Sequence, residues 1–273
     1  MKILVTGHNG FIGKNLAMYL TSKGHEVSGW DYEPNTIPNP EGYDWVVHLG
    51  AITSTTCTDV DQIMEQNFEN SVRLIQACDM MGVNFQYASS ASVYGSHQHF
   101  KENGPLLPQS PYAWSKYLFD RFVNQLKDEF QITVQGFRYF NVYGIGEEHK
   151  GDQASPYTKF REQAISNKKI KLFEGSENYK RDFVWVGDVC RVHELMLEKS
   201  ERGIFNVGTG SPVSFDTVAR TIAQRYSAEL EHIPMPENLR SQYQTYTCAN
   251  LEKLNSVIDM QWTRIEDYIN GTD

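Results

Sequence analysis

The sequence lacks the features of several large protein classes. Its apolar runs fall well short of the roughly 18 to 20 residues that a membrane-spanning helix requires, so we expect no membrane partner. Basic charge is also scarce, because 25 Lys and Arg stand against 34 Asp and Glu, which gives a net charge of −9 and a pI of about 5.4. This balance argues against a nucleic-acid partner. An anionic ligand therefore has to be held by local groups.

Cysteine is rare, and its spacing matches no known metal or redox motif. Cys57, Cys78, Cys190 and Cys248 are separated by 21, 112 and 58 residues, so the chain has no CxxC pair and no zinc or haem spacing. We interpret all four as reduced packing residues, because free cysteine behaves as a small apolar group. The two histidines at positions 97 and 99 lie in a polar stretch without a third ligand, so we expect loop residues and no metal site.

No signal-peptide pattern, linker-like tract or internal repeat is present in the sequence. The chain starts directly in a strand pattern, which predicts a cytoplasmic protein. Its 273 residues, 40% hydrophobic and 12% aromatic, are typical of a folded protein with one domain or two closely joined domains.

Short apolar runs alternate with helical stretches through the first half, which predicts βαβ units and a parallel sheet. We expect strands at residues 3–6, 26–30, 45–49, 85–88 and 133–137, and helices at 11–23, at 60–80 and from 110 onward. Serine and proline at 110 and 111 fit the N-cap and first position of the last helix. Two apolar stripes are predicted to be buried: Val60, Met64, Phe68, Val72 and Ile75 on one helix, and Trp114, Leu118, Phe122 and Leu126 on the other.

The connection after the second strand is unusually short. Residues 31–43 are rich in turn-forming residues and too few for both a helix and a further strand. A standard βαβαβ half contains both, so we expect this crossover to be trimmed.

A GxxGxxG motif at residues 7–13 follows the first strand and opens the first helix. Glycines there let the backbone approach a pyrophosphate at a helix N-terminus, so the motif predicts dinucleotide binding; a tight turn in a non-binding α/β protein is the alternative. Asp31 ends the second strand, where a carboxylate accepts hydrogen bonds from an adenosine ribose and repels a 2′-phosphate; a solvated strand-end acid is the alternative. Because no basic residue occurs between Lys23 and Arg73, we predict NAD in preference to NADP.

Tyr112 and Lys116 lie at positions i and i+4 of a predicted helix, which places a phenol and an ammonium on one face. The positive charges of lysine and of an oxidised nicotinamide favour the phenolate and lower the pKa of the tyrosine, as an acid/base residue requires. This pattern is common on helices by itself. It becomes specific beside the glycine motif and the serine-rich stretch at 88–95, which leaves a strand 22 residues before Tyr112.

These motifs together resemble those of the extended short-chain dehydrogenase/reductases. The resemblance rests on the glycine motif, the strand at 45–51, SSASVYG at 89–95, SPYAWSK at 110–116, RYFNVYG at 138–144 and RDFV at 181–184. Within this superfamily the chain most resembles the ADP-glyceromanno-heptose 6-epimerases, through residues 54–56, 137–144 with 148–151, 171–184 and 240–244. The stretch 171–184 is the most specific, because general sugar epimerases share only its RDFV end.

The resemblance implies roles for individual residues. Tyr112 would be the acid/base, Lys116 the anchor of the nicotinamide ribose, Ser90 the hydroxyl that polarises the sugar oxygen, and Lys150 a second catalytic residue; Ser92 is the alternative to Ser90. The remaining implied contacts are, for the cofactor, Gly7, Asn9, Gly10, Phe11, Ile12, Gly13, Asp31, Leu49, Ala51 and Asn67, and, for the nucleotide sugar, Asn141, Lys171, Arg181, Arg240 and Tyr243. Arg181, Lys171 and Arg240 could instead be ordinary surface groups, and Lys150 a cation on a flexible loop.

We therefore predict a doubly wound α/β Rossmann fold with a smaller, discontinuous α/β substrate domain. The NAD-binding domain is expected in residues 1–141 and 181–208, with 205–210 as its last strand and turn, and the nucleotide-sugar domain in 142–180 and 209–273. The predicted activity is inversion of a carbinol centre by transient oxidation, with C6 of ADP-glyceromanno-heptose favoured. A 4-epimerase, a keto-reductase and a non-catalytic NAD-binding sensor or scaffold are the alternatives. We also expect a homo-oligomer.

Overall fold

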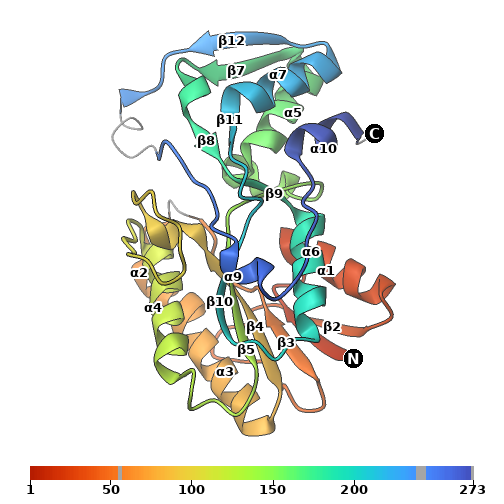
Figure 1. Cartoon of the computed structure of the whole chain (residues 1–273), viewed down its shortest axis with the longest axis vertical. Coiled ribbons are helices and arrows are strands. Elements are labelled where there is room, and N and C mark those ends of the chain that lie inside the picture. Colours follow the sequence, from red (N-terminus) through yellow and green to blue (C-terminus); the bar gives the residue numbers. More distant parts are fainter. Residues whose placement is uncertain (55–56, 238–243, 272–273) are drawn as a thin grey trace.

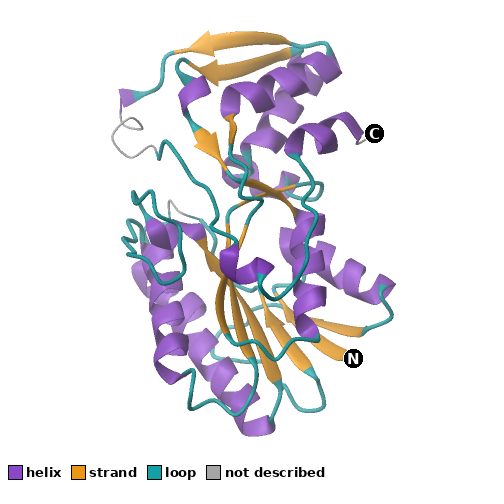
Figure 2. Ribbon diagram, viewed as in Figure 1, coloured by secondary structure: helices purple, strands orange, loops and turns teal. Residues whose placement is uncertain are grey.

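The larger part of the molecule is built on a six-stranded parallel sheet, seen in the lower half of Figures 1 and 2. The computed structural model describes residues 1–54, 57–237 and 244–271. The strand order is β10-β5-β4-β3-β1-β2, which confirms the predicted doubly wound fold and places the last strand at the sheet edge. The strands are β1 (Lys2–Thr6), β2 (Glu26–Trp30), β3 (Trp45–His48), β4 (Asn84–Ser90), β5 (Val134–Tyr139) and β10 (Gly203–Val207).

Helices cover both faces of this sheet. α1 (Phe11–Ser22) and α6 (Val186–Leu197) pack on one face, and α3 (Asn70–Met81) and α4 (Pro111–Leu126) on the other (Figure 1). Alternate residues of β1 point to opposite faces of the sheet: Ile3 and Val5 pack with the first pair of helices, and Leu4 packs with the second. The central strands are therefore buried on both sides, and every residue of β3 and β5 is buried.

The connection between β2 and β3 contains neither a helix nor a strand over residues 31–44. The predicted trimming of this crossover is confirmed.

The connection from β3 to β4 differs from the prediction. It consists of α2 (Val60–Met64), a π-helical segment η1 (Glu65–Glu69) and α3. The wider π turn rotates the buried face, because it holds an extra residue. Ile75 is buried, and Phe68 and Val72 are half-buried against the same core, whereas Val60 is 51% exposed, so the predicted apolar face is only partly the buried face. The residues that are buried instead include Ile63, Asn67, Ser71, Leu74 and Cys78.

The predicted stripe of α4 is also displaced. The helix begins as predicted, with the Ser110 hydroxyl accepting a hydrogen bond from the Ala113 N–H at 3.1 Å and proline at the first position. Trp114, however, is 48% exposed, and the buried face contains Ala113, Lys116, Phe119, Asp120 and Val123. The polar members of this face lie inward because each has a buried partner, as shown below.

The upper half in Figure 1 is a smaller α/β unit. Its helices α5 (Pro156–Asn167), α7 (Phe215–Tyr226) and α10 (Ile265–Gly271) pack with the parallel pair β7 (Lys169–Phe173) and β12 (Glu229–Ile233) around a core that contains Phe160, Ile170, Ile222 and Tyr268. The remaining short elements are β6 (Asn141–Tyr143), β9 (Phe183–Trp185), β8 (Lys180–Arg181), β11 (Val213–Ser214), η2 (Ala91–Tyr94), η3 (Glu148–Gln153) and η4 (Ser176–Asn178).

One segment beyond residue 209 packs with the larger half. α9 (Glu252–Asn255) lies on β10, and Leu254, Ile258 and Met260 share a core with Phe137 and Phe205. The chain then returns to the upper half through α10. We keep the two-domain division as a proposal, with residues 249–260 packed on the nucleotide-binding half.

The four cysteines are free; Cys78 and Cys190 are buried as predicted, whereas Cys57 and Cys248 are half-buried. The histidines at 97 and 99 lie outside helices and strands, as expected. Within the described residues, no group of His, Cys, Asp and Glu is arranged to hold a metal ion. None of the helices in those ranges is long and apolar enough to cross a membrane.

Candidate active site

The glycine motif forms a backbone cradle between β1 and α1. Gly7 has a φ of +68°, and a Cβ there would lie 2.6 Å from the backbone nitrogen of Gly50. A Cβ on Gly13 would overlap with the carbonyl of Gly7. Only glycine fits both positions, so the loop stays close to the N-terminus of α1, where free N–H groups favour an anion.

A cavity of about 480 Å³ lies at the carboxyl ends of β1, β3 and β4. This is the edge at which ligands bind in doubly wound sheets. Every predicted cofactor residue except Asn9 and Asn67 lines the cavity, and so do predicted catalytic residues from two other elements. The predicted residues that line it are Gly7, Gly10, Phe11, Ile12, Gly13, Asp31, Leu49, Ala51, Tyr112, Lys116 and Lys150.

Asp31 follows β2 at one end of this cavity. Its carboxylate accepts a hydrogen bond from the side-chain amide of Asn9 and lies 3.2 Å from Nδ1 of His8, and its side chain is 38% exposed. Asn9 therefore positions Asp31 rather than lining the cavity itself. An exposed, oriented carboxylate at this position fits the predicted contact with a ribose diol.

Asn67 acts on the cavity through the backbone. Its side-chain oxygen accepts a hydrogen bond from the Ile52 N–H at 2.8 Å, and its amide donates to the Ile52 carbonyl at 2.9 Å and to the Ser115 hydroxyl at 3.1 Å. Both amide protons are used in these bonds. Asn67 thus fixes the loop after β3, whose neighbouring residues line the cavity.

Ser90, Tyr112 and Lys116 are brought together by β4 and α4. The Lys116 ammonium donates to the Ala88 carbonyl at 2.9 Å, and the Tyr112 hydroxyl shares a hydrogen bond with Ser90. The alternative, Ser92, has a buried hydroxyl with no hydrogen-bond partner among the described residues, whereas its backbone N–H donates to the Ser90 hydroxyl at 3.2 Å. The geometry therefore favours Ser90 as the partner of the tyrosine.

The pKa values of this pair follow from burial. Burial raises the pKa of Tyr112 above its usual value, and the bond with Ser90 only partly offsets this. Burial also lowers the pKa of Lys116 to about 8, against the opposing effect of Asp120. The expected lowering of the tyrosine pKa is thus absent in the protein alone, because burial outweighs the hydrogen bond with Ser90; the expectation also included a positive nicotinamide.

Lys150 lines the same cavity from a different element, η3. Its ammonium lies 4.8 Å from the centre of the Phe11 ring, and burial lowers its pKa against the opposing effect of Glu147. Glu147 is buried and accepts hydrogen bonds from the Ser155 N–H at 2.8 Å and the Thr158 hydroxyl at 2.7 Å. This anchored carboxylate fixes the start of the segment that carries Lys150.

Comparison with known proteins identifies the family of the chain. A model of the NAD dependent epimerase/dehydratase family matches residues 3–208, which is most of the chain. The chain belongs to this family. The predicted enzyme class and its dependence on NAD are therefore confirmed. The residues fit that cofactor, since the glycine cradle, Asp31 and Lys116 line one cavity.

Solved structures of epimerases match nearly the whole chain. The ADP-L-glycero-D-manno-heptose-6-epimerase of Helicobacter pylori is 25% identical with a TM-score of 0.86, and the match covers 98% of this chain and 94% of that one. The UDP-glucose 4-epimerase of Thermus thermophilus, in complex with NAD, is 27% identical with a TM-score of 0.79, covering 94% and 92%. The UDP-N-acetylglucosamine 4-epimerase of Methanobrevibacter ruminantium has a TM-score of 0.87 over 98% and 97%, but its 19% identity supports the fold alone.

The predicted substrate residues of this epimerase/dehydratase are more scattered. Asn141 is half-buried in β6, Lys171 is exposed in β7, and Arg181 is buried in β8, and none of the three lines the 480 Å³ cavity. The guanidinium of Arg181 donates to the carbonyls of Lys180 and Gln244 and lies 5.2 Å from the centre of the Phe215 ring. Their role in substrate binding stays a prediction. Arg240 and Tyr243 lie outside the described residues.

The sequence analysis missed Tyr139, which lines the cavity at the end of β5. Its hydroxyl is 2.5 Å from Nε2 of His193 on α6, and Nδ1 of this histidine is 2.7 Å from Oε1 of Gln86. Burial lowers the pKa of His193 to about 3, so the ring is neutral. Because the Gln86 oxygen can only accept, Nδ1 carries the ring proton and the Tyr139 hydroxyl donates to Nε2. The only signal in the sequence was a lone histidine on the apolar face of a helix.

Further residues that line the cavity were not predicted. Tyr32 follows Asp31 and donates a hydrogen bond to Glu65 at 3.0 Å, and His149 precedes Lys150. Tyr32 and His149 could both have been predicted, because each is adjacent in the sequence to a predicted residue. Other unpredicted lining residues are Gly50, Thr53, Ser54, Gln66, Ala88, Ser89 and Gln153.

Proposed function

We propose that the chain inverts a carbinol centre of a nucleotide sugar by transient oxidation and re-reduction, and that C6 of ADP-glyceromanno-heptose is the favoured centre. The observation that carries this proposal is the shared cavity of Tyr112 and Lys150, which reach it from α4 and η3. An enzyme that only oxidises or only reduces needs one acid/base group at the reacting oxygen. Two groups on different elements suit an oxygen that occupies two positions in one cycle.

Each catalytic residue has its own role in the two halves of the reaction. NAD, when bound beside the glycine cradle and Lys116, would supply the hydride acceptor for the sugar carbon and the hydride donor for its reduction. In the first half, the Tyr112 phenolate takes the hydroxyl proton as the C–H bond breaks, with Ser90 bonded to the sugar oxygen and the Lys116 ammonium stabilising the phenolate. In the second half, the Lys150 ammonium gives its proton to the carbonyl oxygen as the hydride returns to the other face. Transfer of the Tyr112 proton to Lys150 through solvent resets both groups.

An exocyclic carbon suits this scheme. A small rotation about the bond to the ring exchanges the two faces of the ketone, without turning the whole sugar. The match to a heptose 6-epimerase over 98% of the chain supports this choice. We further propose that the nucleotide sugar lies between the two halves and contacts Asn141, Lys171 and Arg181, and that the enzyme is a homo-oligomer.

The test uses ADP-glyceromanno-heptose deuterated at C6, with NMR of both epimers. We expect deuterium to be retained in the inverted product, with no net release of NADH, and we expect Lys150→Ala to lose inversion. Lys23→Ala, which removes an exposed lysine at the far end of α1, is the matched control and should leave inversion unchanged. Loss of deuterium to solvent, or normal inversion by Lys150→Ala, contradicts the proposal.

A 4-epimerase acting on another nucleotide sugar is the second candidate. The 27% identity to a UDP-glucose 4-epimerase supports it. A turnover screen of ADP-, GDP-, UDP- and dTDP-sugars, with NMR of the products, separates the two: inversion of a ring carbon in a UDP-sugar, with no turnover of the heptose, favours this candidate.

A further inference from the structure

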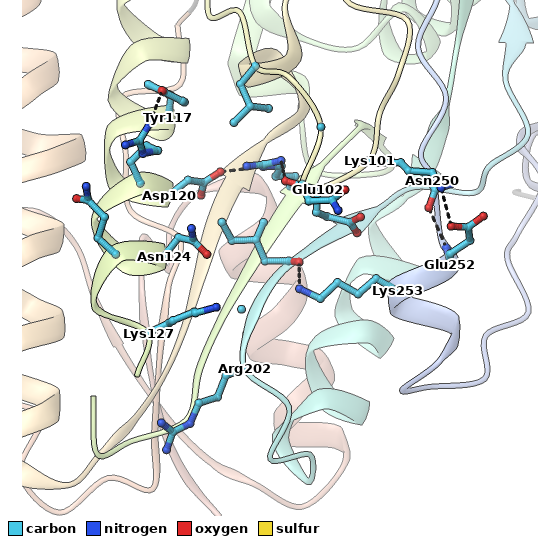
Figure 3. Close-up of a pocket in the computed structure, with 18 residues that line it drawn as sticks. Lys101, Glu102, Tyr117, Asp120, Asn124, Lys127, Arg202, Asn250, Glu252 and Lys253 are labelled. Carbon is cyan, nitrogen blue, oxygen red and sulfur yellow. Dashed lines mark hydrogen bonds and ion pairs between the residues drawn. The ribbon is translucent and has the colours of Figure 1, made fainter. Parts of the chain in front are cut away.

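A second cavity, of about 890 Å³, lies at the opposite edge of the sheet, beside β10. Its walls come from residues 101–106, the C-terminal half of α4, the start of β10 and α9 (Figure 3). It shares no lining residue with the active-site cavity. Its volume falls in the range of about 300–1,000 Å³ that is typical of small-molecule sites.

The acidic side chains of this second cavity all have partners. Asp120 forms a buried ion pair with Arg138 at 2.8 Å, and Glu252 pairs with Lys101 at 3.0 Å. The Glu102 carboxylate accepts a hydrogen bond from the backbone N–H of Asn206 at 2.9 Å. Each of these carboxylates is therefore engaged within the protein.

More basic than acidic side chains line this second cavity. Within the described residues, Lys127, Arg202 and Lys253 form no ion pair with a carboxylate. Arg202 donates to the Phe130 carbonyl at 2.9 Å and Lys253 to the Ile204 carbonyl at 2.7 Å, so among the described residues neither is in direct contact with a carboxylate. This local positive excess occurs in a chain with a net charge of −9.

Two of these cations converge on one part of the cavity. Figure 3 shows Lys127 reaching from the C-terminal end of α4 and Lys253 from α9, with their ammonium groups directed toward one another. Gly203 lies beside them with a φ of +110°, and a Cβ there would be 3.1 Å from Nζ of Lys253. Burial and the charges of Arg138 and Lys127 lower the pKa of Lys253, against the opposing effect of Glu102. The charge of Lys127 thus contributes to the electrostatic environment of Lys253.

We propose that this cavity binds a phosphate group of a small metabolite between Lys127 and Lys253. An ammonium is a compact point charge that suits a phosphate oxygen, and a dianion between two ammoniums removes their mutual repulsion. Asn124 adds amide donors on the same side of α4, and Leu106, Tyr117 and Ile204 provide apolar surface for the organic part of the ligand. The proposal does not depend on the nucleotide-sugar reaction.

The test is a calorimetric titration of the NAD-saturated protein with glucose 6-phosphate and with inorganic phosphate. We expect saturable binding of one phosphate group per chain, and roughly tenfold weaker binding in each of Lys127→Gln and Lys253→Gln, because each removes one charge-assisted contact. Tighter binding of the ester than of inorganic phosphate identifies a metabolite, since only the ester reaches the apolar walls.

Two matched variants separate this site from others. Lys101→Gln removes a lysine of the same cavity that is already paired with Glu252, so it should change the affinity less than about twofold. Lys150→Gln tests whether the phosphate enters the active site instead. Binding that does not saturate, that is equally tight in the double variant of Lys127 and Lys253, or that is lost in Lys150→Gln overturns the proposal, as does equal affinity for the two probes. All four lysines are substituted by a polar residue, and a thermal melt of each variant checks the fold.

Discussion

The cofactor side and the substrate side of the active site are built in different ways. On the cofactor side, backbone loops at the ends of β1, β3 and β4 meet in one cavity, and Gly7 and Gly13 fit only because they lack a Cβ. On the substrate side, the predicted residues Lys171 and Arg181 belong to separate short strands of the upper half. The cofactor side thus depends on local backbone geometry, and the substrate side depends on how distant side chains are brought together.

The largest expected effect falls on Tyr112, where the two sides meet. Tyr112→Phe removes the transferable proton and keeps the ring, so turnover should fall by about 100-fold or more. NAD affinity and thermal stability should stay nearly unchanged. Steady-state turnover, cofactor titration and a thermal melt measure the three quantities. Near-normal turnover of the variant would show that proton transfer occurs elsewhere.

A substitution in the glycine loop between β1 and α1 tests the cofactor side alone. In Gly13→Ala the new methyl group overlaps with the Gly7 carbonyl, so the loop must move away from the N-terminus of α1. We expect NAD affinity to fall by about tenfold or more, since overpacking costs about 1–3 kcal/mol. Gly42→Ala is the control for a general loss of stability, because this exposed glycine has a φ of +83°, so alanine strains the backbone there without touching the cradle. Equal NAD affinity of Gly13→Ala and the unmodified chain would remove the cradle argument.

The pH dependence of NAD binding tests Lys116. Its folded-state pKa of about 8 lies below the usual value of 10.5, so between these pH values the unfolded chain binds more protons, and stability should rise with pH. NAD affinity should fall over the same range by about tenfold, because the ammonium contact is lost. Lys116→Met should remove both pH dependences. Affinity that stays constant up to pH 10 would exclude the ammonium as the ribose anchor.

The smallest expected effect concerns the choice between NAD and NADP. Repulsion between Asp31 and a 2′-phosphate should favour NAD by about 1–3 kcal/mol after screening. Asp31→Asn should reduce that preference by roughly tenfold, and NAD affinity should also fall, because the amide has one neutral acceptor oxygen for the ribose in place of two charged ones. Titration of both proteins with both cofactors gives the ratio directly. Tighter binding of NADP to the unmodified protein would contradict the prediction.

The sequence predicted the parts of the fold that depend on short-range pattern. The six sheet strands, the cap at Ser110 and the trimmed crossover were found because hydrophobic period and turn residues act locally. The buried stripes were found only in part, because Asn67, Lys116 and Asp120 take inward positions through bonds to distant partners such as Ile52, Ala88 and Arg138. Apolar spacing carries no information about such partners, and it gives no sign of the π turn at η1.

The same distinction holds for the candidate site. Most predicted cofactor residues line one cavity because they follow consecutive parallel strands. Tyr139 was missed because its polar partner, His193, lies 54 residues away in the sequence, on α6. The positions of Lys171 and Arg181 depend on the packing of the upper half, which no motif in the sequence specifies.

The hydrogen bonds behind Tyr139 have a consequence for what the active site accepts. Gln135 donates to the carbonyls of Met196, Lys199 and Glu201, which leaves its oxygen to accept from Gln86. The hydrogen bonds keep the same direction further along: His193 donates to Gln86, and the Tyr139 hydroxyl donates its only proton to His193. That oxygen is left with lone pairs alone. A ligand atom that hydrogen-bonds to it has to be a donor, such as a hydroxyl or an amide NH₂, so hydrogen bonds behind the cavity lining restrict the polarity of the group that can bind there.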